Sequence, residues 1–371
     1  MAKFRKIGIL SSGGDAPGMN AAIRAVTRRA LSQGIECVGI LGGYAGLLGA
    51  ADESNPEVIR ARYLRPLDTH SVSNIVTRGG TMLYSSRCPE FKTEEGMAKA
   101  LKTCHDNQID AVVALGGDGT FRGATDLTNH GIPSIGIPCT IDNDITATDQ
   151  TIGFDTALNT ALTMIDALRD TAESHARCIV TEVMGNGCGF LSLYLGIATG
   201  AISTAIPEIP FDRDYAINKI REAREKYGKR GIIAICGEGM PDVNGVRYGQ
   251  AFADEVAATT GIDSRFTKLG HIIRGGNPTL RDRLTATQMG VEAVNLLLDG
   301  KSNLVMSVNE NRITSVDINY ALVVDRMYKN KLKDGDLDGF TAEQLARMRA
   351  RCEERQEKIK RLYGISHDIC M

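Results

Sequence analysis

A glycine-rich turn directly follows a short apolar segment in the first third of the chain. Residues 116–120 read Gly-Gly-Asp-Gly-Thr, come after the run Ala111–Leu115, and lead into a helical pattern from Phe121. Such a strand–turn–helix segment is how α/β proteins build a phosphate site, because glycine lets backbone N–H groups approach the oxygens and a helix start favours anions. Asp118 adds a carboxylate for a divalent cation. A purely structural turn is the alternative for this segment alone.

A second acidic turn follows the next apolar run. Residues 140–144 read Thr-Ile-Asp-Asn-Asp and come after Ile135–Pro138. A solvated Asx turn or a calcium loop is the alternative, but residues 145–147 lack the further ligands and the glycine of an EF-hand. An aspartate within reach of a sugar hydroxyl can accept its proton during phosphoryl transfer. Acidic turns after two successive strands therefore indicate phosphoryl transfer.

Short β-type runs alternate with helical patterns, which predicts an α/β fold with largely parallel sheets and crossover helices. The expected strands are Lys6–Leu10, Cys37–Leu41, Ala111–Leu115, Ser134–Ile137, Cys178–Val183 and Gly231–Cys236. A length of 371 residues favours two domains. A charged helix is expected over Thr341–Tyr363, with a thin apolar stripe at Leu345, Met348, Ile359 and Leu362 that suits a peripheral position.

Composition narrows the class of protein and its compartment. A formal net charge of −2 gives no basic field for nucleic acid or membranes. The apolar runs fall far short of the roughly twenty residues that span a bilayer, and the N-terminus shows no signal-peptide pattern. Nine scattered cysteines form no C-x-x-C pair, which indicates reduced thiols and no zinc site. We therefore expect a cytoplasmic protein.

Further glycine-rich loops carry acids, a histidine and an arginine. Arginine can grip a sugar phosphate through two hydrogen bonds, and glutamate can accept from hydroxyls. Taken singly, most such residues are surface residues. These loops are Ser11–Gly18, Val183–Gly189, Gly237–Gly239 and Lys268–Gly276.

The order of these motifs resembles the 6-phosphofructokinases of the bacterial type over roughly residues 5–325. The residues that carry the resemblance are Gly13–Ala21, Arg78–Thr81, Ser85–Arg87, Gly116–Thr120, Thr140–Asp144, Glu182–Gly185 and Gly270–Gly276. The resemblance implies a glycolytic kinase that transfers a phosphoryl group from Mg-ATP to the 1-hydroxyl of fructose 6-phosphate. It also implies two similar Rossmann-like three-layer domains with the active site in the cleft between them, and a homotetramer, with a dimer as the alternative.

The same resemblance divides the chain into three parts. Residues 1–153 and 274–322 would bind nucleotide and Mg²⁺. Residues 154–273 and 323–340 would bind the sugar phosphate. Residues 341–371 would form a C-terminal helical extension.

Residue roles also follow from the resemblance. Asp142 would be the general base, with Asp144 nearby, and Asp118 would hold Mg²⁺. Gly14, Arg87 and Thr140 would stabilise the transferring phosphoryl group. The nucleotide would lie along Gly14, Arg87, Cys88, Gly117, Asp118, Gly119 and Thr120. The sugar phosphate would contact Thr140, Ile141, Asp142, Met184, Gly185, Asn186, Glu238, His271, Ile272, Ile273 and Arg274, with Arg177 and Arg265 reaching in from a neighbouring subunit.

Three positions depart from the pattern of the family. Asn186 stands where an arginine is usual, which removes a cation near the site. Cys139 stands where ATP users usually have glycine and pyrophosphate users have lysine. In the effector site, Arg24, Arg28, Arg169, Lys229 and Arg230 keep basic character, but Thr69 replaces an arginine and Ile202 an acid. Classical allosteric control is therefore not expected.

The phosphoryl donor depends on space and charge at two positions. Pyrophosphate users usually place an aspartate at the position of Gly119, which fills the α-phosphate site. Gly119 leaves that room, and Cys139 is neutral at its ordinary pKa, so ATP is the expected donor. A pyrophosphate-dependent enzyme is the first alternative, and a catalytically weak regulatory subunit, motivated by Asn186, is the second. A dinucleotide-binding oxidoreductase is disfavoured because residues 116–120 lack the G-x-G-x-x-G spacing.

Overall fold

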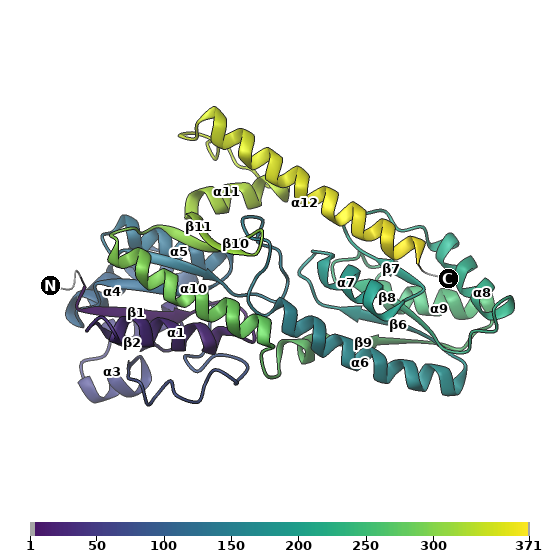
Figure 1. Cartoon of the computed structure of the whole chain (residues 1–371), viewed down its shortest axis with the longest axis horizontal. Helices are drawn as coiled ribbons and strands as arrows, with labels where there is room; N and C mark the ends of the chain where they lie inside the picture. The colour runs from purple at the N-terminus through teal and green to yellow at the C-terminus, as the bar shows by residue number, and fades with distance from the viewer. Residues whose placement is uncertain (1–3, 370–371) are drawn as a thin grey trace. The chain divides into compact units, whose positions relative to one another are not determined.

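The computed structural model describes residues 4–369, which form two compact units (Figure 1). The first unit comprises residues 4–141, 145–156 and 276–352, and the second comprises residues 142–144, 157–275 and 353–369. The first contains a seven-stranded sheet and the second a four-stranded sheet. Both sheets are dominated by parallel strands, which confirms the predicted α/β class.

The seven-stranded sheet has the order β11-β10-β5-β4-β1-β2-β3. Its strands are β1 (Lys6–Ser11), β2 (Glu36–Ile40), β3 (Leu64–Leu67), β4 (Ala111–Gly116), β5 (Ser134–Pro138), β10 (Leu304–Asn309) and β11 (Arg312–Asp317). The central strands run parallel, and the edge strands β3 and β11 pair antiparallel. β4 is buried along its whole length, as expected of an apolar strand covered on both faces.

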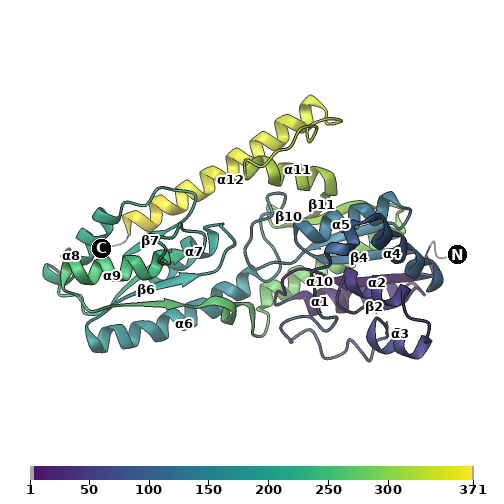
Figure 2. The ribbon, with the colours of Figure 1, turned by 180° about the vertical axis from the view of Figure 1, so that it is seen from behind.

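Helices cover both faces of this sheet. Figure 1 shows α1 (Met19–Leu31) beside α10 (Leu280–Leu298), and Figure 2, seen from behind, shows α2 (Tyr44–Ala51), α4 (Glu94–Asp106) and α5 (Asp118–Asn129). The remaining elements of this unit are α3 (Pro56–Arg62), the 3₁₀ helix η1 (Pro89–Lys92) and α11 (Ile318–Tyr328).

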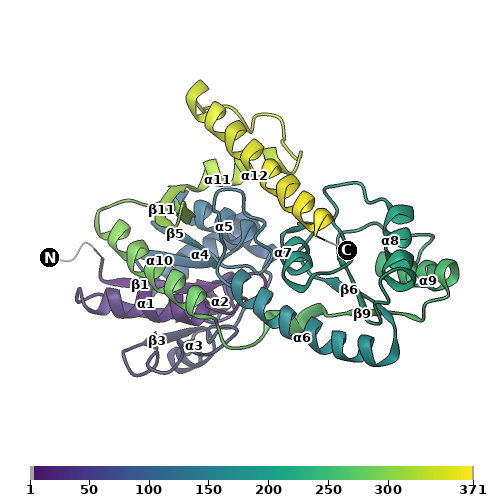
Figure 3. The ribbon, with the colours of Figure 1, turned by 45° about the vertical axis from the view of Figure 1, so that its right-hand side comes forward.

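The four-stranded sheet has the order β7-β8-β6-β9 and is parallel throughout. Its strands are β6 (Cys178–Val183), β7 (Ser203–Ala205), β8 (Ile232–Gly237) and β9 (Ser264–Lys268). The accompanying helices, labelled in Figure 3, are α6 (Phe154–His175), α7 (Phe190–Thr199), α8 (Arg213–Glu225) and α9 (Tyr248–Thr260). The 3₁₀ helix η2 (Gly270–Arg274) follows β9. All six strands expected from the sequence are present within one residue of their expected ends.

The last helix, α12 (Ala342–Asp368), is longer than the predicted Thr341–Tyr363. It belongs to the first unit up to Cys352 and to the second from Glu353. In the first unit, Val323 and Val324 of α11 pack on Met348 and Cys352 of α12. Residues 323–340 therefore lie in the first unit, whereas the resemblance implies that they help to bind the sugar phosphate. The functional division of the chain stays a prediction.

The helices and the cysteines bear on two further expectations, that no segment spans a membrane and that the thiols are reduced. No helix within residues 4–369 is both long and apolar enough to cross a bilayer. The cysteines of this described part are free thiols, and all but Cys88 are buried.

A buried carboxylate ties together two distant segments of the first unit. Asp282 of α10 has no exposed surface, and its Oδ1 accepts from Gly153 N at 3.0 Å. Its Oδ2 accepts from Thr156 N at 2.8 Å and from Thr156 Oγ1 at 2.6 Å. Thr279 donates from its backbone N to Thr156 Oγ1 at 3.0 Å and from its hydroxyl to Asp155 at 2.6 Å. This network joins the two places where the chain leaves and re-enters the unit.

Burial raises the pKa of Asp282 to about 6. Because this value lies above that of the unfolded chain, Asp282 stabilises the fold most below the unfolded pKa, and that contribution is lost as pH rises through about 6.

In Asp282→Asn an amide N–H faces a backbone donor, at a cost of about 1–3 kcal/mol. We expect a lower melting temperature than in the wild type, with the larger deficit on the acid side of pH 6. Asp299→Asn, at the exposed end of α10, is the control, and a deficit that grows with pH would contradict this reading.

Candidate active site

Hydrogen bonds join the loops that follow β1, β4 and β5 in the first unit. Ser12 N donates to Leu115 O at 3.0 Å, and Thr120 Oγ1 donates to Ser12 O at 3.1 Å. On the other side, Cys139 N donates to Gly116 O at 3.0 Å. The ends of three adjacent parallel strands are therefore fixed to one another, at the edge where such sheets bind ligands.

The glycines of residues 116–119 have different roles. A Cβ on Gly116 would lie 2.3 Å from Thr120 Oγ1 and 2.4 Å from Ser12 O, so only glycine allows this close approach. A Cβ on Gly117 or Gly119 would meet nothing within 4 Å. These two glycines leave open space at the N-terminus of α5, where backbone N–H groups and the helix dipole favour an anion.

Asp118 opens α5 beside this space, and its side chain is partly exposed. Its Oδ2 lies 3.7 Å from the Lys329 ammonium, which also contacts Asp325 Oδ2 at 2.7 Å. Asp325 is buried, and its Oδ1 accepts from Thr146 N at 3.1 Å and from Thr146 Oγ1 at 2.8 Å. Burial alone would raise the pKa of Asp325. Its partners, Lys329 first among them, outweigh burial and lower that pKa below its ordinary value. Sequence reasoning missed Lys329 and Asp325.

The segment before η1 runs along the loop that follows β1. Ser11 Oγ contacts Thr81 Oγ1 and donates to Tyr84 O, both at 2.8 Å, and Ser85 Oγ donates to Gly13 O. These contacts place the segment of Arg87, which is exposed, alongside that of Gly14, which is also exposed. Cys88 is half-buried at the start of η1.

Two hydrogen bonds to the backbone of Thr140 fix the start of the second acidic turn. Thr140 N donates to Ile152 O at 3.0 Å, and Thr140 O accepts from Thr151 Oγ1 at 2.6 Å. Ile141 and Asp142 are buried, with Asp142 only 6% exposed. Asn143 has a φ of 50°, a left-handed conformation that asparagine tolerates better than most residues.

Cys139, one of the two predicted donor-specificity positions, is buried at 1% exposure. Burial raises the pKa of its thiol well above the ordinary value, with the nearby Asp282 carboxylate as a lesser cause. The side chain therefore stays neutral and adds no charge to the site.

In the second unit, the structure brings together four of the predicted sugar-phosphate residues. Glu238 Oε1 accepts from Gly185 N at 3.2 Å and from Asn186 N at 2.8 Å, directly after buried Met184. Asn186 Nδ2 donates to Asp144 Oδ2 at 3.3 Å. Asn186 therefore contacts an acidic residue of the turn with a neutral amide, at a position where the resemblance led us to expect an arginine.

Six further predicted sugar-phosphate residues form two groups. Arg177 and Arg265 both pair with Asp263, and Arg177 Nε lies 2.6 Å from its Oδ2. His271, Ile272, Ile273 and Arg274 lie in η2, where Ile273 is buried and His271 and Ile272 are exposed. Ile273 thus anchors η2, and the exposed side chains remain accessible.

Two arginines of α12 support the acidic turn, and sequence reasoning missed both. Arg355 is 5% exposed, donates to Asn143 O, and places its guanidinium 4.7 Å from the centre of the Phe190 ring. Arg351 donates from Nε to Thr146 O at 2.9 Å and pairs with Asp149 at 2.6 Å. Because the two arginines lie one helical turn apart, the residues on both sides of Asp144 depend on one helix.

The chain is similar in sequence to known phosphofructokinases. Residues 6–297 match the sequence family described as Phosphofructokinase. The chain is 48% identical over 329 residues to "ATP-dependent 6-phosphofructokinase 1" of Clostridium perfringens, covering 89% of this chain and 97% of that protein. It is 45% identical over 319 residues to "ATP-dependent 6-phosphofructokinase" of Halalkalibacterium halodurans, covering 86% and 94%.

Solved structures agree with these matches. Phosphofructokinase from Saccharomyces cerevisiae superposes with a TM-score of 0.79 and 31% identity, over 90% of this chain and 47% of that one. A pyrophosphate-dependent phosphofructokinase from Marinobacter aquaeolei superposes with a TM-score of 0.68 over 85% of this chain and 83% of that one. At 21% identity, the second likeness concerns the fold alone.

The Arg355 contact generates a prediction about local stability. Arg355→Met keeps a long side chain over Phe190 but removes the donor to Asn143 O. Hydrogen bonds to charged groups contribute about 1.5–3 kcal/mol, so we expect backbone amides of residues 142–146 to exchange with deuterium roughly tenfold faster or more. Arg361→Met, on the exposed face of α12, is the matched control. Unchanged exchange in a folded Arg355→Met protein would show that α12 does not support the turn.

Proposed function

The chain belongs to the phosphofructokinase family, and on this basis we propose that it phosphorylates fructose 6-phosphate at the 1-hydroxyl with Mg-ATP. The products are fructose 1,6-bisphosphate and ADP. The observation that carries this proposal is the 48% identity to an ATP-dependent 6-phosphofructokinase over 97% of that protein's length. The open space beside Asp118 at the start of α5 supports it independently.

Asp142 is the general base of the proposed reaction. It accepts the proton of the 1-hydroxyl while that oxygen forms a bond to the γ-phosphorus of ATP and the bond from phosphorus to the ADP oxygen breaks. Its burial, and its place two residues after the hydrogen-bonded backbone of Thr140, support this role, because a base must be positioned closely to act. By the resemblance, Gly14, Arg87 and Thr140 would stabilise the transferring group, and Asp144 is two residues from the base in the sequence.

Asp118 would hold the Mg²⁺ ion together with oxygens of the nucleotide phosphates. The described residues contain no cluster of three acids, histidines or cysteines that could hold a metal alone. This fits Mg²⁺, which typically uses one or two carboxylates and leaves the remaining positions to phosphates and water. When bound, the ion would neutralise phosphate charge. Lys329, 3.7 Å from Asp118, adds a further positive charge beside the same carboxylate.

ATP is the donor because the loop leaves room for it. The nucleotide phosphates would lie along Gly117, Asp118, Gly119 and Thr120, with Arg87 and Cys88 beside them. A Cβ on Gly119 would meet nothing within 4 Å, and the buried thiol of Cys139 contributes no charge. Neither position carries the aspartate or lysine expected of a pyrophosphate user.

The sugar phosphate would bind the second unit. Asn186, Glu238 and η2, with its His271 and Arg274, supply polar groups for hydroxyls and phosphate. Arg177 and Arg265 both pair with Asp263 and would extend into the active site of a neighbouring subunit. Activity would then require a homo-oligomer, and a tetramer is the favoured state.

The proposal is tested by the identity of the product. Purified protein incubated with fructose 6-phosphate, ATP and MgCl₂ should give phosphorus resonances of fructose 1,6-bisphosphate and ADP. Removal of Mg²⁺ with EDTA should stop the reaction. Hydrolysis of ATP with no phosphorylated sugar formed would contradict the proposal.

Replacement of the base separates chemistry from binding. Asp142→Asn should lower kcat by about 10²–10⁴, because removal of a positioned base costs that much, and should leave fructose 6-phosphate binding largely intact. Steady-state kinetics and calorimetric titration of the sugar phosphate measure the two effects. Asp166→Asn, at an exposed position of α6, is the control. A kcat near that of the wild type would remove Asp142 from the mechanism.

The space at Gly119 generates a prediction about the donor. Gly119→Asp should impair ATP use selectively, because the carboxylate would meet the α-phosphate in a partly desolvated site. Like charges at about 4 Å cost about 4 kcal/mol at an effective dielectric of 20. Gly119→Asn has nearly the same volume without the charge and should lose much less kcat/KM for ATP. Equal losses in both variants would show that volume and not charge controls the donor.

A further inference from the structure

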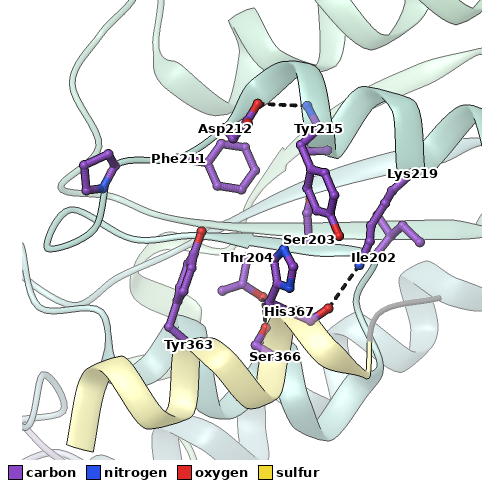
Figure 4. Close-up of a pocket in the computed structure, with 12 residues that line it drawn as sticks. Ile202, Ser203, Thr204, Phe211, Asp212, Tyr215, Lys219, Tyr363, Ser366 and His367 are labelled. Carbon is purple, nitrogen blue, oxygen red and sulfur yellow. Dashed lines mark hydrogen bonds between the residues drawn. The ribbon is translucent and has the colours of Figure 1, made fainter. Parts of the chain in front are cut away.

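The chain beyond residue 297, where the match to the family ends, forms β10, β11, α11 and α12. In the first unit, Val324 of α11 packs on Met348 of α12. In the second unit, the His367 ring near the end of α12 stacks on Tyr215 of α8, with centroids 4.9 Å apart (Figure 4). Both helices are therefore packed parts of the fold, and their side chains have fixed places from which to contact a ligand.

Backbone hydrogen bonds fix the end of α11 at Lys329. Asn330 has a φ of 53°, and its backbone N donates to Met327 O at 3.2 Å. The backbone N of Lys331 donates to Arg326 O at 2.8 Å. A left-handed residue with these two hydrogen bonds is the Schellman motif that ends many helices. The backbone of Lys329, directly before the left-handed residue, is therefore held in one place.

The Lys329 ammonium contacts two carboxylates of the first unit. Its Nζ lies 2.7 Å from Asp325 Oδ2 and 3.7 Å from Asp118 Oδ2. The Asp325 side chain is buried, and its other oxygen accepts two hydrogen bonds from Thr146. The Lys329 side chain itself is 28% exposed. Asp325 is thus a fixed anchor that holds the ammonium beside Asp118 without covering it.

The surroundings of this ammonium suit an anion. Asp118 is the first residue of α5, where the helix dipole and the backbone N–H groups favour negative charge. Gly117 and Gly119 leave open space at the same helix end. A lysine ammonium has three donors and is a common partner of phosphate oxygens. Because two carboxylates outnumber one ammonium, an anion would bind here together with a further cation at Asp118, as Mg²⁺ would be.

We propose that Lys329 is a further nucleotide-binding residue, which contacts the terminal phosphates of the Mg-nucleotide. In the bound state Lys329 keeps its pair with Asp325, leaves the Asp118 carboxylate to the metal and donates to a phosphate oxygen. The inference rests on the proposed function, because it needs a nucleotide with its metal at Asp118. It adds a binding residue from α11, outside the segment that matches the family.

Amine labelling of the unmodified protein tests this contact at one residue. The lysines are acetylated with an N-hydroxysuccinimide ester in excess MgCl₂, and the rate at each is measured by mass spectrometry of peptides. Saturating ADP should slow the acetylation of Lys329 severalfold, whereas AMP, which lacks the terminal phosphates, should change it little. The exposed Lys331 is the internal reference and should react equally in all samples. Nucleotide bound elsewhere on the protein leaves Lys329 unprotected.

Replacement of the lysine tests its share of the binding. Lys329→Met should weaken Mg-ADP in calorimetric titrations about tenfold or more and raise the KM for ATP similarly, because a charge-assisted hydrogen bond is lost. The KM for fructose 6-phosphate should stay near that of the wild type, since none of the residues proposed to bind the sugar contacts Lys329 in the described hydrogen bonds and ion pairs. Lys331→Met removes the same charge two residues away and is the matched control.

Lys329→Met leaves the buried charge of Asp325 unpaired, which destabilises a fold. A second comparison avoids this cost. Asp325→Asn should bind Mg-ADP about tenfold or more tightly than the double variant Lys329→Met/Asp325→Asn, in which both charges are removed.

The inference is overturned if ADP does not protect Lys329, if AMP protects it equally, or if Asp325→Asn and the double variant bind Mg-ADP alike. Phosphorylation of fructose 6-phosphate by the wild type in any of these cases would leave the proposed function standing. Protection of Lys329 by ADP in a protein that forms no fructose 1,6-bisphosphate would instead contradict the proposed function and keep the contact.

Discussion

The close approach of Gly116 to Ser12 and Thr120 is the contact on which the nucleotide part of the site depends. It brings the loops after β1 and β4 within hydrogen-bond distance, and Cys139 N extends the same network to β5. Any Cβ at Gly116 would push these loops apart. The open space at Gly117 and Gly119 exists because the backbone on both sides of it is fixed in this way.

The acidic turn depends on support of a different kind. Asn143 adopts a left-handed conformation, and its carbonyl accepts from the buried Arg355 of α12. The chain that continues from the turn is held at Thr146 by Asp325 and by Arg351. A catalytic carboxylate loses effectiveness when it is displaced by even about 1 Å. Charged residues distant in sequence therefore matter to Asp142 although none of them is proposed to touch the substrate.

Much of the fold was predictable from the sequence because the expected parallel strands, such as β1, β4 and β6, are mostly apolar runs that lead into glycine-rich turns. The parallel strand β9 was missed because its sequence, SRFTK, is mostly polar. β3 was missed because it contains Pro66 and is four residues long, and β11 because it is half-exposed at an edge. The motifs supplied the candidate residues and the chemistry proposed for them. The Asp118–Lys329 pair and the Arg355–Asn143 contact were not predictable, because both join segments that only the folded chain brings together. In α12, the apolar pattern of the sequence gives no sign that Arg355 is buried.

The proposed reaction requires that the space beside Asp118 accepts the phosphates of ATP. It is tested most directly by the unmodified protein, with fructose 6-phosphate turnover measured in parallel with saturating Mg-ATP and with saturating Mg-pyrophosphate. We expect a kcat and a kcat/KM that are both higher with ATP. Faster turnover with pyrophosphate than with ATP would contradict the assignment of that space to a nucleotide.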